Sequence, residues 1–374
     1  MKKIITLNGR DGIGKTEQMR LLRSLPELHV TRALKQYGHK WPELSGSEEF
    51  DWWFEQSTFE EFLDVIAGSL NERHLDVSPE KVTVHERGTR MFLAVCIATL
   101  ATRFKKSVSE VQEGVQQQFL SRINYAPELE SDIVLVENAD YGDYIKRLGS
   151  HLPVQPSPFT PEQREIYGQY QTHLRTALGM CLKTDTDVIE VDQPIVDIQN
   201  RVRKAISTLV GVQLDDFCGN IQNLVCLGGM SESGKSMLGQ NLHTVHGSYR
   251  LKLKYFSGAF GDDPALALEV LRFLHMHRHI SLASVESLHN AGLPIVFKKL
   301  LGKRVRVVFL DAPQEERARR HMLLPEATME EFLRKDALKE SRGALQVKTV
   351  ADLVIDTSLS SLEETCQQAF LLGS

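Results

Sequence analysis

The sequence has few cysteines and no long apolar run, and these two shortages exclude several classes of protein. Its 374 residues include five cysteines, which lie far apart and form no C-x-x-C pair. Such cysteines are typical of a reduced, cytoplasmic protein and exclude a dense disulfide framework. No apolar stretch approaches the roughly 18 residues of a membrane span, so we expect no membrane partner. The first residues lead directly into a glycine-rich loop, and we expect no signal peptide there.

The chain also lacks a strong excess of either charge. Its 44 Lys and Arg residues stand against 49 Asp and Glu residues, which gives a formal net charge of −5. The chain as a whole therefore exerts no general attraction on nucleic acid, although a local basic groove stays open. With 42% hydrophobic and 25% charged residues, it has the composition of a globular protein that is long enough for two domains. A homodimer is also left open.

What the sequence does contain is one pattern that occurs twice, G-x-x-x-x-G-K-[ST]. We call Gly9 to Thr16 the first phosphate loop and Gly229 to Ser236 the second phosphate loop. Each follows an apolar run typical of a buried strand and precedes a helical pattern, which is the context that this motif requires. The loop amides and the helix N-terminus would then face phosphate oxygens. The sequence therefore predicts two sites for a nucleoside triphosphate, namely ATP with Mg²⁺.

The pattern predicts a role for each type of residue in the two loops. Lys15 and Lys235 would stabilise the β- and γ-phosphates, and Thr16 and Ser236 would bind Mg²⁺. The other loop residues that we expect to contact the cofactor are Gly9, Asp11, Gly12, Gly14, Gly229, Ser231, Ser233 and Gly234.

Glu86 and Arg87 follow a buried-type strand at residues 81–85. Ligands bind at the carboxyl ends of the strands in open α/β sheets. A carboxylate there can hold Mg²⁺ through water or accept a substrate proton, and an arginine can clamp the transferring phosphate. We predict that both residues act at the acceptor side of the first site, with a solvated ion pair as the alternative. Before them, residues 50–70 are rich in aromatics and have a helical period.

The second half of the chain carries three further sets of cations. Arg250, Lys252 and Lys254 alternate on one face of an extended segment at 248–256, where they suit an anionic substrate such as a nucleic-acid backbone. The alternative is the polar face of an edge strand. Residues 332–336 and 339–343 are spaced like a lid, with Arg334 and Arg342 as catalytic candidates. The run at 280–285 is either a strand that ends at Glu286, in a position equivalent to Glu86, or the start of the next helix.

Residues 1–209 resemble the thymidylate kinase family of nucleoside monophosphate kinases. The motifs that carry the resemblance are Asn8 to Gln18, Val30-Thr31-Arg32, Val84 to Arg87 and Val188 to Pro194. The resemblance implies a parallel sheet between helices and a substrate-binding role for Arg32. The sequence departs from the family in three places: no Glu-Pro-Gly-Gly follows Arg32, Glu86-Arg87 replaces Asp-Arg, and the lid region at 151–160 has no arginine.

The second half is similar to the dephospho-coenzyme A kinase and adenylate kinase-like kinases. Leu310 to Pro313 with Arg317, Arg334 to Asp336, and Ala351 to Asp356 carry this similarity. We therefore predict an α/β protein of two kinase-like domains, at 1–210 and 221–374, joined by a linker at 211–220. The predicted reaction transfers the ATP γ-phosphoryl group to a nucleotide, a nucleoside or a related small acceptor, and a bifunctional enzyme with two such activities is left open. A kinase acting on a base or end within DNA or RNA, and a nucleotide-binding scaffold, are the alternatives.

Overall fold

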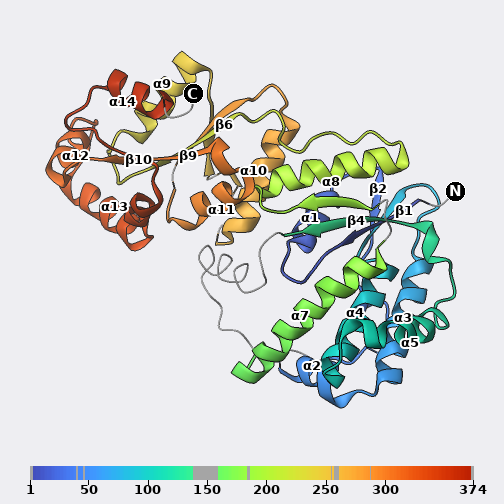
Figure 1. The fold of residues 1–374 in the computed structure, drawn as a ribbon. Helices are drawn as coiled ribbons and strands as arrows, with labels where there is room; N and C mark the ends of the chain where they lie inside the picture. The colour runs from blue at the N-terminus through green and yellow to red at the C-terminus, as the bar shows by residue number, and fades with distance from the viewer. Residues whose placement is uncertain are drawn as a thin grey trace. The chain divides into compact units, whose positions relative to one another are not determined.

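The computed structural model describes residues 3–38, 41–44, 47–137, 159–182, 186–253, 255–256, 261–286 and 288–371. The chain divides into two compact units (Figure 1). Unit 1 comprises Met1–Gln193 and Ile198–Asp215, and unit 2 comprises Pro194–Asp197 and Asp216–Ser374. The division falls within the stretch predicted as a linker. Phe217 and Cys218 of that stretch are buried, and the Cys218 thiol donates to the carbonyl of Leu271 over 3.2 Å.

Unit 1 is built on a parallel sheet with the strand order β2-β3-β1-β4-β5. The central strands are β-branched and apolar and are buried on both faces, as parallel strands between helices require. The strands are β1 (Ile4–Asn8), β2 (Leu28–Val30), β3 (Val82–Glu86), β4 (Glu130–Val136) and β5 (Asp187–Glu190).

The helices of unit 1 enclose two hydrophobic cores. One core joins the sheet to α1 (Lys15–Leu22) and α8 (Ile195–Val210). The other is rich in aromatic residues and lies among the remaining helices (Figure 1). Those helices are α2 (Ser47–Asp51), α3 (Phe59–Leu75), α4 (Thr89–Phe104), α5 (Val108–Leu120) and α7 (Pro161–Cys181).

The helical period predicted for residues 50–70 is interrupted. A π-helical turn, η2 (Trp52–Gln56), follows α2, and the backbone is extended at Ser57 and Thr58. Thr58 then caps α3 by accepting a hydrogen bond from the Glu61 amide over 3.1 Å. Trp53 and Phe54, both in the wider π turn, line a cavity of unit 1.

Unit 2 repeats the arrangement with the strand order β10-β9-β6-β8-β7. Its strands are β6 (Asn223–Gly228), β7 (Tyr249–Lys252), β8 (Leu282–Glu286), β9 (Val305–Asp311) and β10 (Leu353–Asp356). Its helices are α9 (Lys235–His246), α10 (Asp263–Met276), α11 (Gly292–Leu301), α12 (Gln314–His321), α13 (Met329–Ser341) and α14 (Leu362–Leu371). The extended segment predicted at 248–256 is regular strand only at 249–252, where it forms the edge of the sheet.

The two sheets match in strand order and in register. Read from the second strand of each unit, both have the order 2-3-1-4-5. Leu7, two residues before the first phosphate loop, pairs with Glu86. Cys226 pairs with Val285, so Leu227, two residues before the second loop, stands beside Glu286. The predicted fold class, two α/β units with parallel sheets flanked by helices, is confirmed.

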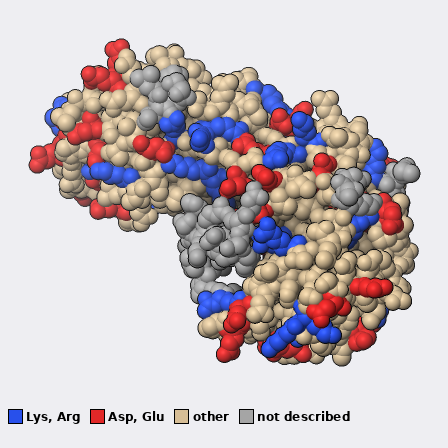
Figure 2. Space-filling model, viewed as in Figure 1, with Lys and Arg blue, Asp and Glu red and all other residues tan. Residues whose placement is uncertain are grey.

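The membrane-spanning potential of the helices and the charge of the surface bear on the expected partners. Among the helices that the structure describes, none combines the length and the hydrophobicity needed to cross a bilayer. On the face that Figure 2 shows, basic and acidic side chains are interspersed.

Candidate phosphate-binding and acceptor sites

The first phosphate loop connects β1 to α1 and has the backbone that the motif requires. Gly9, Gly12 and Gly14 all have positive φ, at 137°, 76° and 93°. At Gly9 a Cβ atom would lie 2.6 Å from the carbonyl oxygen of Leu135, so only glycine fits between the loop and β4. The loop therefore passes close to β4 and leads into α1 with the backbone that the phosphate-binding motif requires.

The second phosphate loop, between β6 and α9, has positive φ at the same three positions. Gly229 and Gly234 have φ of 135° and 96°, and a Cβ at Gly229 would lie 2.4 Å from the carbonyl oxygen of Leu310. The position of Gly12 is occupied here by Glu232, which has φ of 58°. A residue with a side chain is strained in this region, so the surrounding structure must hold it there.

The lysine of each loop folds back onto the loop itself. Lys15 Nζ donates to the carbonyls of Gly9 and Arg10 over 2.8 and 2.6 Å, and Lys235 Nζ donates to the Met230 carbonyl. Burial, together with the nearby Arg87, lowers the pKa of Lys15 to about 7. Burial and the nearby Lys339 lower the pKa of Lys235 well below its usual value. Both amines thus stand where a bound anion would stabilise their charge, which fits the phosphates of ATP.

The hydroxyl group of each loop meets a carboxylate from the neighbouring strand. Thr16 Oγ1 donates to Glu86 Oε1 over 2.8 Å, and Ser236 Oγ donates to Glu286 Oε2 over 3.4 Å. Hydroxyl and carboxylate oxygens are ligands that Mg²⁺ accepts. Thr16 and Ser236 would hold the metal of a Mg·ATP complex, so each loop contains the hydroxyl that the predicted cofactor requires.

The turn after β3 is held by an arginine that sequence analysis missed. Arg73 on α3 is 1% exposed, and its two Nη atoms donate to the carbonyls of Glu86 and Arg87 over 3.0 and 2.8 Å. Arg87 has φ of 62°, an unusual value outside glycine, and its guanidinium forms an ion pair with Asp11. Arg73 therefore fixes a strained turn that directs Glu86 toward the loop.

Asp11 in the first phosphate loop has a full set of partners. Besides Arg87, it accepts hydrogen bonds from Tyr167 Oη over 2.9 Å and from Gln171 Nε2 over 3.0 Å. Burial alone would raise the pKa of Asp11, but the cations of Arg87 and Lys15 hold it below the usual value. Asp11 therefore connects the loop to α7 and to the turn after β3.

A cavity of about 520 Å³ opens beside this turn. Asp11, Thr16, Glu86 and Arg87 line it where it meets the phosphate loop. The rest of its lining is mostly aromatic: Trp41, Phe50, Trp53, Phe54, Phe92, Phe159, Tyr167 and Tyr170. The volume is within the range of small-molecule sites. A molecule in this cavity would reach both the phosphate loop and Glu86.

In unit 2, α13 is fastened to the second phosphate loop. Arg317 on α12 is buried and donates to the carbonyl of Ser231 over 3.3 Å and to Asp336 Oδ2 on α13 over 3.0 Å. Lys339, one turn further along α13, lies close enough to Lys235 to lower its pKa. Two neighbouring lysines would favour an anion between them, so Lys339, which sequence analysis did not single out, is a candidate phosphate ligand.

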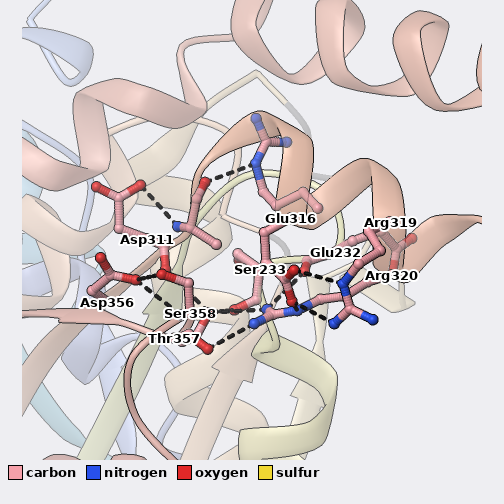
Figure 3. A network of polar contacts seen from close by, with 11 residues as sticks. Glu232, Ser233, Asp311, Glu316, Arg319, Arg320, Asp356, Thr357 and Ser358 are labelled. Carbon is pink, nitrogen blue, oxygen red and sulfur yellow. Dashed lines mark hydrogen bonds and ion pairs between the residues drawn. The ribbon is translucent and has the colours of Figure 1, made fainter.

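A polar network holds the strained Glu232 in place (Figure 3). Arg320 donates to the carbonyl of Glu232 over 3.3 Å and to the carbonyl of Thr357 over 2.6 Å. Thr357 Oγ1 in turn donates to the carbonyl of Ser233 over 3.2 Å. Helix α12 and the turn after β10 therefore support the second loop at the position where the first loop has glycine.

The remaining predicted residues lie in different surroundings. Arg334 and Arg342, on α13 and just after it, are exposed, and the exposed Arg32 lies over the ring of Tyr37 at 4.7 Å. Arg250 is engaged inside unit 2, where its Nε donates to Glu286 Oε1 over 2.7 Å. Lys252 is half-buried on β7. Lys254 and most of the predicted lid region, at 151–158, fall outside the described residues.

No protein-family model matches the sequence, and no curated protein matches it. Among solved structures, a thymidylate kinase from Candida albicans is 13% identical, with a TM-score of 0.39, and the match covers 55% of this chain and 91% of that one. A gluconokinase from Sinorhizobium meliloti 1021 is 14% identical (TM-score 0.30; 41% and 92% covered). A shikimate kinase from Acinetobacter baumannii in complex with shikimate is 20% identical (TM-score 0.29; 41% and 92% covered). At these identities and scores the similarities identify neither an activity nor a substrate.

Proposed function

We propose that unit 1 is an ATP-dependent phosphotransferase that moves the γ-phosphoryl group to a nucleotide, a nucleoside or a related small acceptor. The observation that supports this most directly is the contact of 2.8 Å between Thr16 Oγ1 and Glu86 Oε1 at the mouth of the cavity. It brings the residue that would bind Mg²⁺, the carboxylate that would receive an acceptor proton and the space for an acceptor into one place.

The residues of unit 1 divide the work. The amides of the first phosphate loop and Lys15 bind the phosphates and neutralise charge as the phosphoryl group transfers. Bound Mg²⁺ supplies further neutralisation of phosphate charge. Glu86 receives the proton of the acceptor. The hydrogen bonds of Arg73 to the backbone of Glu86 and Arg87 hold Glu86 beside the first phosphate loop. Positioning and charge account for this chemistry, because phosphoryl transfer needs little covalent participation from the protein.

We propose that unit 2 binds a second nucleotide without an acceptor of its own. Glu286 is 2% exposed, and its carboxylate accepts from Arg250 Nε over 2.7 Å. A Cβ at Gly239 would lie 2.3 Å from Glu286 Oε1, so α9 also closes over this carboxylate. Glu286, the counterpart of Glu86, is therefore inaccessible to an acceptor. Lys235 and Lys339 remain in positions where they would bind a phosphate group.

The test is transfer from γ-labelled ATP by the full chain and by its Lys15→Ala and Lys235→Ala variants. The acceptors would be deoxynucleosides, their monophosphates, dephospho-coenzyme A, and plain or modified DNA. We expect a labelled small molecule whose formation is lost in Lys15→Ala and retained in Lys235→Ala. Label on DNA that is lost in Lys235→Ala would assign the function to nucleic-acid modification instead. ATP binding without any transfer would leave a nucleotide-binding scaffold.

A further inference from the structure

The cavity of unit 1 is walled by aromatic rings that contact one another. Phe50 lies 4.7 Å from Phe54 and 5.3 Å from Phe159, measured between ring centroids. Tyr167 continues this wall at 5.5 Å from Phe159, and Tyr170 at 5.4 Å from Phe54. These rings form an apolar wall of aromatic faces and edges, against which a further aromatic ring would pack favourably. The wall therefore favours a ligand with a planar aromatic part.

The charges at the cavity are unfavourable to an acceptor that already carries phosphate. Among the described residues that line it, three are carboxylates, Asp11, Glu49 and Glu86, and two are cations, Lys35 and Arg87. Arg87 is already paired with Asp11, and Lys35 is an exposed side chain. Among these described residues negative charge is in excess, and neither cation is both buried and unpaired, so a phosphate dianion would be disfavoured there.

The polar end of the cavity suits a hydroxyl group. Glu86 is half-buried there, its backbone is fixed by Arg73, and one of its oxygens already accepts a hydrogen bond from a hydroxyl, that of Thr16. A second hydroxyl that approaches Glu86 from the cavity would stand beside the first phosphate loop. This is the arrangement that a general base needs with respect to its substrate.

From these three features we infer that the acceptor of unit 1 is an uncharged aromatic alcohol of nucleoside size, not a nucleoside monophosphate. This inference rests on the proposed function and narrows its acceptor. The acceptor oxygen forms a new bond to the γ-phosphorus of ATP while the bond from that phosphorus to the β,γ-bridging oxygen breaks. The hydroxyl proton passes to Glu86, ADP leaves with the bridging oxygen, and the product is a phosphate monoester.

The tryptophans of the chain provide a direct measurement of occupancy. The chain has three, Trp41, Trp52 and Trp53. Trp41 and Trp53 line the cavity, and Trp52 packs against both, with ring centroids 6.4 and 6.1 Å away. A ring that stacks in the cavity therefore changes the emission of the protein, and no tryptophan elsewhere obscures the signal.

The experiment titrates the full chain with a matched pair, thymidine and thymidine 5′-monophosphate, and repeats it with the three other deoxynucleoside pairs. We expect quenching by at least one nucleoside, with binding about tenfold or more tighter than that of its monophosphate, because the added charges meet the carboxylates. Trp41→Leu should weaken the binding, whereas Trp52→Phe, which alters a ring outside the lining, should preserve it. Tighter binding of the monophosphates would overturn the inference.

The same reagents separate this inference from the proposed function. With labelled ATP, label on the nucleoside supports both. Label on the monophosphate alone, or on a single-stranded oligodeoxynucleotide alone, retains a phosphotransferase and overturns the inference. If a nucleoside quenches the emission but is never labelled, the cavity binds the inferred class of ligand and the proposed phosphotransferase activity is wrong. Absence of quenching by all four nucleosides, with label on another acceptor, overturns the inference.

Discussion

The two phosphate loops have the same backbone, but the carboxylates beside them have opposite surroundings. Glu86 opens onto a cavity, whereas Glu286 is buried and paired with Arg250. Both stand at the same register next to the strand that precedes the loop. The strand order therefore determines where a carboxylate stands, and the neighbouring side chains determine whether it can reach a substrate. A phosphate loop with its lysine and hydroxyl does not by itself make an acceptor site.

The most severe test of this comparison is a pair of isosteric substitutions, Glu86→Gln and Glu286→Gln. If Glu86 receives the acceptor proton, Glu86→Gln should reduce the rate of label transfer by a factor of about 10²–10⁴. Glu286→Gln should leave that rate within about twofold, because its carboxylate is withdrawn. The measurement is kcat with labelled ATP at a saturating acceptor concentration. An equal loss in both variants would show that both carboxylates face an acceptor.

The support of the second loop can be removed with Arg317→Met. Arg317 and Asp336 form a buried ion pair, and removal of one partner from such a pair costs about 3–5 kcal/mol. We expect unit 2 to lose stability and α13 to separate from the loop. Urea unfolding followed by circular dichroism should show the loss. Tryptophan emission arises only from unit 1, so the unfolding transition that it reports should be the same as in the wild type. A shift of the tryptophan transition by the same amount would contradict independent units.

The middle positive-φ position of the loops, Gly12 in the first and Glu232 in the second, distinguishes the units in a different way. Gly12→Ala should destabilise unit 1 by about 1 kcal/mol, because alanine is strained at φ of 76°. Glu232→Ala retains the existing strain and loses mainly the contact of its carboxylate with His321 at 3.4 Å, so a smaller change is expected. Thermal unfolding by tryptophan emission and by circular dichroism would measure the two. A larger loss in Glu232→Ala would mean that its side chain, and not its backbone support, holds the second loop.

The phosphate loops were predictable because their residues are adjacent in the sequence. The fold class followed from the alternation of strands and helices. Arg73 was not predictable, since its partners are two carbonyls in a turn that forms only when α3 packs beside β3. The aromatic residues of the cavity come from α2, η2, α4, α7 and the segments before α2 and α7, and no local pattern reveals that they meet.

The same limit explains two further differences in unit 2. The sequence left open whether Glu286 ends a strand or begins a helix, and its pairing with Arg250 depends on β7 lying at the edge beside β8. Lys339 looked like one of several lid cations, and only the ion pair of Asp336 with Arg317 turns that side of α13 toward Lys235. The surroundings of Glu286 and Lys339 thus depend on contacts between segments that are far apart in the sequence, which local patterns do not reveal.

The lowered pKa of Lys15 predicts a pH dependence of the stability of unit 1. The folded-state pKa of Lys15 is about 7, below the usual lysine value of 10.5, so between these values the unfolded chain binds more protons than the folded one. Stability should therefore rise with pH across this window, by roughly 1 kcal/mol between pH 7 and pH 8. The measurement is urea unfolding followed by tryptophan emission, with Lys15→Met as the control that should lose this slope. ATP should also abolish the slope, because phosphate charge raises the pKa of Lys15, whereas a slope that persists in Lys15→Met would assign it to another group.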